Sequence, residues 1–198
     1  VHNEVIAMLP AQSALSEQLK DRYNTLKNAS GKDKGRMMRE AGGRFNPLVI
    51  EGEGTKLAMD PRLIGYGTRE VGNQVLTDSA VLDPKSTSLK VNRMLNTALT
   101  HYREHPLATQ MVFMEVGYTD TTERTVGRDA AGEPIKQTFR VFNLAKEIKR
   151  RLIEEGVPES EIAIFAGMSQ EKRTEAAAMM REGKIRFAIG STATMGTG

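Results

Sequence analysis

The feature that most constrains the fold is an alternation of short apolar runs with helical stretches between residues 110 and 190. Two stretches carry the helical period: residues 142–155, where Gly156 terminates the expected helix, and residues 169–180, where Gly183 does so. Three runs are short and mainly apolar, as buried parallel strands are: residues 110–116, 162–166 and 185–189. Strands that alternate with helices through short connections form a parallel sheet covered on both faces. The sequence therefore predicts an α/β fold.

The chain before this region has helical rather than strand character. Leu15, Leu19, Tyr23 and Leu26 follow one another at spacings of three and four, which predicts one apolar face of a helix over residues 13–28. A further helix, capped by Ser86 or Ser88, is expected to stop at Pro106. Its expected buried positions are Val91, Leu95, Ala98 and Tyr102.

Three segments lack clear periodicity. Residues 30–46 are polar and basic and contain four glycines, which predicts a mobile connection. Residues 65–84 show no period, and the polar residues 118–138 are expected to form an exposed insertion. We therefore expect two parts: a mainly helical segment over residues 1–84 and an α/β part over residues 85–198.

Positive charge is concentrated in one segment. The chain of 198 residues carries a net charge of +3, but residues 20–44 alone carry +5 and the remainder carries −2. Four cations lie close together in this segment: Lys32, Lys34, Arg36 and Arg39. Clustered Lys and Arg side chains can neutralise nucleic-acid phosphates. The alternative is a solvated helix and loop whose charges maintain solubility, and charge alone favours that alternative.

Several classes of protein are excluded by what the sequence lacks. It contains no cysteine, so disulfide scaffolds, cysteine-ligated zinc sites and thiol catalysis are excluded. The absence of cysteine also favours a cytoplasmic protein. No apolar run approaches the length of a membrane span, and no signal-peptide pattern opens the chain, so no membrane partner is expected. The start at Val1 and the glycine-rich end are typical of a piece of a longer protein.

The last predicted strand runs into a loop, residues 190–198, that contains three glycines, three threonines and one serine. Ligands bind at the carboxyl ends of strands in open parallel sheets. Glycine lets backbone N–H groups approach a phosphate closely, and hydroxyl groups add donors. The alternative is an ordinary strand exit. Residues 31–35 and 52–56 resemble phosphate loops superficially, but neither has the spacing of one.

His101, Glu104 and His105 form an H-x-x-E-H pattern, which is also found in zinc peptidases. Two histidines four residues apart on a helix face one metal ion, and the glutamate could activate water. Pro106 ends the helix at once and no third protein ligand is evident, so a polar last helical turn is the favoured interpretation.

Taken in order, several motifs resemble the C-terminal RecA-like lobe of Swi/Snf-type superfamily 2 helicases and translocases, most closely in the large helicase–methylase proteins of bacterial phages and mobile elements. The likeness covers residues 48–198. Its parts are the Asp-Pro-Arg-Leu ending of residues 56–63, the helix entry at 88–90, a motif IV-like strand at 110–115, the strand and glycine of 162–167 followed by Arg173, and a motif V-like segment at 186–198.

The resemblance implies a partial RecA-like parallel sheet preceded by a mainly helical linker, within an ATP-driven motor on double-stranded DNA. It implies that Ser191 and Thr192 contact a DNA phosphate, and that Gly196, Thr197 and Gly198 line the ATP cleft. The basic residues Lys32, Lys34, Arg36 and Arg39 lie outside the likeness, and their charge makes them further expected DNA contacts. Residues Gly167 and Arg173 are expected to shape the lobe.

The first RecA-like lobe, with its phosphate loop and magnesium-binding acids, and the arginine finger of motif VI are not encoded in residues 1–198. ATP and Mg²⁺ are therefore expected in the complete protein, with the missing lobe as partner. No cofactor, metal or catalytic residue is expected in this chain alone, which should be inactive. A non-catalytic nucleic-acid-binding module and the zinc peptidase are the alternative functions.

Overall fold

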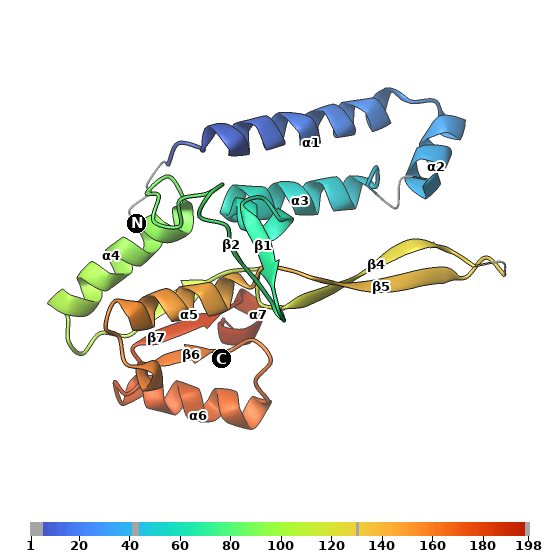
Figure 1. Ribbon diagram of the computed structural model, residues 1–198. Helices are drawn as coiled ribbons and strands as arrows, with labels where there is room; N and C mark the ends of the chain where they lie inside the picture. The colour runs from blue at the N-terminus through green and yellow to red at the C-terminus, as the bar shows by residue number, and fades with distance from the viewer. Residues whose placement is uncertain (1–5, 41–43, 130, 197–198) are drawn as a thin grey trace. The chain divides into compact units, whose positions relative to one another are not determined.

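A computed structural model describes residues 6–40, 44–129 and 131–196; of Arg39 and Glu40 it describes the backbone only (Figure 1). The chain forms two compact units. The first contains the chain up to Lys90 together with residues Thr119–Phe142, and the second contains Val91–Tyr118 together with the chain from Asn143 onward. Within the described ranges, no helix is both long and apolar enough to cross a membrane.

Helices dominate the start of the first unit: α1 (Pro10–Asn28), α2 (Gly31–Glu40), α3 (Pro47–Met59) and the 3₁₀ helix η1 (Pro61–Ile64). Three of them begin at proline, whose fixed φ and missing N–H suit a first helical turn. Gln12 joins α1 to α3, because its buried side-chain amide donates to the carbonyl oxygen of Leu57 at 3.0 Å. The predicted helix over 13–28 is confirmed, but Tyr23 is 49% exposed rather than buried.

The expected mobile connection over residues 30–46 is wrong, because α2 occupies most of it. Ser30 explains why a helix forms despite Gly31 and Gly35. Its hydroxyl oxygen accepts a hydrogen bond from the backbone N–H of Asp33 at 3.2 Å and donates to the Asp33 carboxylate at 2.7 Å. This is the hydrogen-bonding pattern of an N-cap, which satisfies a donor that the first helical turn leaves free.

Two antiparallel hairpins complete the first unit: β1 (Thr68–Val71) with β2 (Gln74–Thr77), and β4 (Thr121–Arg128) with β5 (Pro134–Arg140). The first hairpin was not predicted, whereas the exposure expected of residues 118–138 is confirmed and takes the form of a long two-stranded ribbon (Figure 1). Arg140 links the hairpins, donating to the carbonyl oxygen of Gly72 at 2.7 Å and to the Asn73 side chain at 3.0 Å.

A buried ion pair lies at the end of α3. Asp60 is 0% exposed and Arg62 is 1% exposed. The Arg62 guanidinium donates to both carboxylate oxygens of Asp60, at 2.9 and 2.7 Å, and to the hydroxyl of Thr77 at 2.9 Å. It also lies 4.6 Å from the ring centroid of Phe142. The Asp-Pro-Arg-Leu segment therefore joins η1 to the β1–β2 hairpin.

The second unit is a three-stranded parallel sheet with helices, and the predicted α/β class is confirmed. Its strands are β3 (Gln110–Phe113), β6 (Ile162–Ile164) and β7 (Phe187–Gly190), in the order β3-β7-β6. Its helices are α4 (Lys90–Glu104), α5 (Leu144–Glu154), η2 (Glu159–Glu161), α6 (Gln170–Arg181) and the short α7 (Thr192–Met195). Figure 1 shows α5 and α6 on opposite sides of the sheet.

Alternate residues of β7 pack against different helices, as the period of two requires. The ring of Phe187 lies 5.5 Å from that of Tyr102 on α4, while Ala188 packs in a cluster with Phe165 and with Ala176 of α6. The caps follow the sequence signals: the Ser169 hydroxyl accepts from the backbone N–H of Lys172 at 3.4 Å, and the predicted terminal glycines 156 and 183 both have positive φ.

Candidate nucleic-acid interface

The carboxyl edge of the parallel sheet brings together Glu115, Ser191 and Thr192. Glu115 follows β3, and the other two residues follow the neighbouring strand β7. The hydroxyl and the backbone N–H of Thr192 both donate to one carboxylate oxygen of Glu115, at 2.7 and 3.3 Å. The two residues are 77 positions apart in sequence, and only the pairing of β3 with β7 makes them neighbours.

These hydrogen bonds, first the one from the hydroxyl, hold the pKa of the Glu115 carboxyl below its ordinary value. Because the pKa is lowered in the folded chain, the contact stabilises the fold at pH values above the ordinary carboxyl pKa. Its contribution is lost as the pH falls through the lowered value.

Two glycines allow the chain to turn tightly after β7. A Cβ on Gly190 would lie 2.7 Å from the side chain of Met195, and a Cβ on Gly196 would lie 2.6 Å from the backbone oxygen of Thr192. Gly196 has a φ of −92°, which any residue can adopt, so close approach rather than backbone conformation explains this glycine. Of the three residues predicted for the ATP cleft, Gly196 therefore has a local packing role. Thr197 and Gly198 lie outside the described residues.

Ser191 forms its described hydrogen bonds within the same turn. Its backbone N–H donates to the Thr194 hydroxyl oxygen at 2.9 Å, and the two hydroxyls lie 3.2 Å apart. The hydroxyls predicted to contact DNA therefore have partners inside the protein: Thr194 for Ser191 and Glu115 for Thr192. A phosphate at this edge would have to exchange with those partners.

The segment after β3 is held in place by two residues that sequence reasoning did not single out. The hydroxyl of Tyr118 donates to the carbonyl oxygen of Met114 at 2.6 Å, and burial raises the pKa of Tyr118 to about 12. The Asn143 amide donates to the carbonyl oxygen of Tyr118 at 3.0 Å, while its side-chain oxygen caps α5. These contacts position Glu115 next to Thr192. Its only sequence signal was its place at the end of a predicted strand.

Arg173 also lies at this end of the sheet. It belongs to α6, and its Nε donates to the carbonyl oxygen of Met168 at 3.1 Å, just after the positive-φ turn at Gly167. The bond ties the first turns of α6 to the loop after β6. Arg173 therefore has a clear positioning contact within the unit.

The four predicted basic residues belong to α2, in the other unit. Lys32 and Arg36 are exposed and Lys34 is half-buried, while the side chain of Arg39 lies outside the described part of the chain. Arg36 also pairs with Asp33 at 3.0 Å. The two superficial phosphate-loop patterns lie within helices α2 and α3, which agrees with their rejection.

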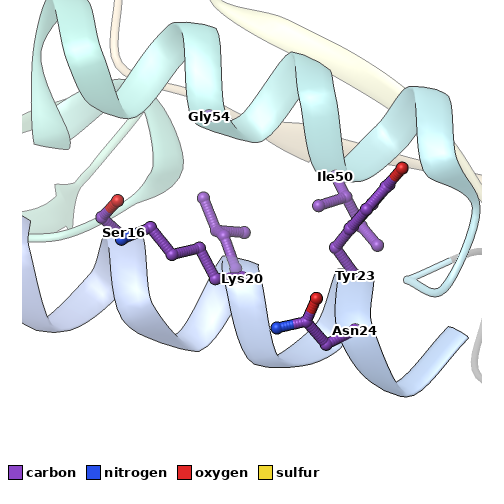
Figure 2. A pocket seen from close by; sticks show the side chains of 7 residues that line it. Ser16, Lys20, Tyr23, Asn24, Ile50 and Gly54 are labelled. Carbon is purple, nitrogen blue, oxygen red and sulfur yellow. The ribbon is translucent and has the colours of Figure 1, made fainter. Parts of the chain in front are cut away.

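A shallow pocket of about 380 Å³ lies between α1 and α3 (Figure 2). Its described lining consists of Ser16, Leu19, Lys20, Tyr23, Asn24, Ile50 and Gly54. Lys20 pairs with Glu17 at 2.6 Å. The lining includes no acid or histidine that could act as a general acid or base.

The structure brings the side chains of His101, Glu104 and His105 together at the end of α4, whose last residue is Glu104. One ligand atom from each lies within 4.8 Å of the others, and the two imidazole rings stack with centroids 5.6 Å apart. All three residues are exposed. The cluster therefore presents metal ligands on a surface rather than in a cleft that would bind a peptide.

Comparisons with protein families, with curated proteins and with solved structures find no match for this chain. The functional interpretation therefore depends on the ordered sequence motifs and on the geometry at the carboxyl edge of the sheet.

Proposed function

We propose that this chain is the C-terminal RecA-like lobe of an ATP-dependent DNA helicase or translocase of the Swi/Snf-type superfamily 2, acting on double-stranded DNA in the cytoplasm. Support comes from the order of the motifs along residues 48–198 and from the parallel α/β unit that contains the later ones. The single observation that carries the proposal is the position of Ser191 and Thr192. They lie at the carboxyl edge of the sheet, where open α/β sheets bind ligands.

DNA binding at this edge is an exchange of hydrogen-bond partners. A backbone phosphate accepts from the Thr192 hydroxyl in place of the Glu115 carboxylate, which now holds it at 2.7 Å. Because two anions repel each other, Glu115 must turn away when the phosphate enters. The contact carries no base information, so the binding is insensitive to sequence.

ATP and Mg²⁺ belong, in this proposal, to the complete motor. The described residues at this edge supply hydroxyls and the Glu115 carboxylate, and the negative charge of that carboxylate repels a triphosphate. They therefore do not form a nucleotide site by themselves. The chain contributes one wall of the cleft through residues 196–198. Hydrolysis requires the phosphate cradle of the other lobe.

Substitution of the basic residues of α2 tests whether this helix contributes to DNA binding. We expect the chain to bind double-stranded DNA weakly, with an affinity that falls steeply as salt rises. Replacing Lys32, Lys34, Arg36 and Arg39 by Gln should flatten the slope of log affinity against log salt by roughly 2–4, because each phosphate contact contributes about 0.9. Fluorescence anisotropy at several salt concentrations measures the slope.

The matched control removes the same charge from the hairpins of the same unit. Arg69, Arg124, Arg128 and Lys136 are all exposed, and replacing them by Gln should leave the slope close to wild type. An equal slope for wild type and the α2 variant would show that α2 is only a solvated helix.

A further inference from the structure

The chain carries a cluster of metal ligands outside the proposed interface. His101 and Glu104 lie in the last turn of α4, and His105 follows the helix directly. The backbone N–H of His105 still donates to the carbonyl oxygen of His101 at 2.9 Å, so the spacing i, i+3 and i+4 places all three on one face. Their ligand atoms lie within 4.8 Å of one another. The chain after the cluster leads directly into the first residue of β3, Gln110. The backbone N–H of Gln110 donates at 2.8 Å to the carbonyl oxygen of Arg186, which immediately precedes β7, so the amino ends of both strands lie here. The cluster is therefore at the opposite end of the sheet from Thr192.

Arg186 holds the backbone of this turn in place. It is 7% exposed, and its guanidinium donates to the carbonyl oxygens of Tyr102, His105 and Ala108 at 3.2, 2.8 and 2.9 Å. It also lies 4.4 Å from the ring centroid of Tyr102. These three hydrogen bonds already fix the backbone around the ligand side chains. A bound ion therefore need not order the turn, and the entropy cost of binding is lower.

The ligand chemistry fits a borderline divalent ion. Imidazole nitrogens and one carboxylate are the donors that Zn²⁺ accepts, and the negative end of a helix favours a cation. Arg103 lies on the same turn, and its guanidinium pairs with Glu155 at 3.2 Å. The chain has no cysteine and only three histidines, so two of its three strongest candidate ligands for such an ion lie here.

We propose that His101, Glu104 and His105 bind one Zn²⁺ ion through three protein ligands, with water completing the tetrahedron. The bound ion bridges the last turn of α4 and stiffens the connection to β3. This site is independent of the proposed DNA function, and it requires no catalysis by the ion.

Zinc titration of the full chain, stripped with chelator and followed by calorimetry, tests the site. We expect one Zn²⁺ per chain, with affinity reduced at least tenfold by His101→Gln, Glu104→Gln or His105→Gln. Two matched controls should bind as wild type: His2→Gln removes the remaining histidine, and Glu175→Gln removes an exposed carboxylate of α6. Co²⁺ in place of Zn²⁺ should give a visible absorption band that each ligand variant loses.

The three ligand side chains are exposed, so the variants should melt like the wild-type chain without metal. Zn²⁺ should raise the melting temperature of the wild type but not of His101→Gln, because an ion stabilises only the state that binds it. Absence of stoichiometric zinc binding would overturn the proposal. The proposal would also be overturned if any one of the three ligand variants bound zinc with less than a tenfold loss of affinity. Loss of zinc binding in His2→Gln would overturn it as well.

Discussion

Asp60→Ala should lower the free energy of unfolding of the first unit by about 3–5 kcal/mol, the typical cost of breaking a buried ion pair. The substitution leaves the Arg62 guanidinium, which is 1% exposed, without its two charge-assisted hydrogen bonds. It also removes the side chain that caps η1, where the Asp60 carboxylate accepts from the backbone N–H of Arg62 at 3.0 Å. Thr77 and the ring of Phe142 are uncharged neighbours of Arg62 and do not replace the carboxylate.

Urea denaturation followed by circular dichroism measures the change. Asp83→Ala is the matched control, because the exposed Asp83 carboxylate also accepts a local backbone hydrogen bond, from Lys85 at 2.9 Å, but pairs with no buried cation. It should cost less than about 1 kcal/mol. Replacing both members of the buried pair by Leu and Met should cost less than Asp60→Ala, since no charge is then left unpaired. A loss below about 1 kcal/mol for Asp60→Ala would contradict the role assigned to the pair.

Gly196→Val should reduce DNA-stimulated ATP turnover at least tenfold in the longer protein that we propose contains this lobe. A Cβ at this position lies 2.6 Å from the backbone oxygen of Thr192, so the turn must open. Opening it moves Thr192 away from Glu115 and from the phosphate position. Thr192→Ala should have a smaller effect of roughly threefold. It leaves the backbone in place, and the bond to phosphate that it removes, worth about 1.5–3 kcal/mol, only replaces a bond of the same kind to Glu115.

The turn lies at the surface, so both variants should unfold near the wild-type temperature. Gly52→Val in α3 is the matched control, since a Cβ there meets nothing within 4 Å. It should keep normal stimulation. If Gly196→Val and Thr192→Ala both retained full stimulation by DNA, the turn after β7 would be a plain strand exit.

The parallel sheet could be predicted because each of its elements carries a local signal. Leu144, Ile148 and Leu152 repeat at the helical period, and all three are 0–1% exposed. Glycines at 156 and 183 end the helices with the positive φ that this residue favours. Hydrophobic burial on one face and a turn after it suffice to define such elements.

Elements whose signals are short or contradictory were missed. Each strand of the β1–β2 hairpin has four residues, and its turn at Gly72 and Asn73 is secured by Arg140 from far along the chain. In α2 the glycines indicated a mobile connection, but the cap provided by Ser30 outweighs them. No helix was predicted over α3, although Asn46 caps it.

The candidate interface was only half predictable for a related reason. The sequence identified Ser191 and Thr192 from their place in a glycine-rich strand exit. It could not identify Glu115 as the partner of Thr192, because their contact depends on β3 lying beside β7. Long-range pairing of this kind leaves no local pattern. The burial of Asp60 and Arg62 also left no local pattern, since Thr77 and Phe142, which contact Arg62, lie further along the chain.

The most direct test of the central claim is ATP hydrolysis with and without double-stranded DNA, measured on the longer protein and on this chain of 198 residues alone. A lobe of a DNA motor predicts that DNA accelerates turnover by the longer protein. It also predicts no turnover by the chain alone, because one lobe cannot bring the phosphate cradle, magnesium and arginine finger together. Turnover by the longer protein that is indifferent to DNA, or DNA-stimulated turnover by the chain alone, would contradict the claim.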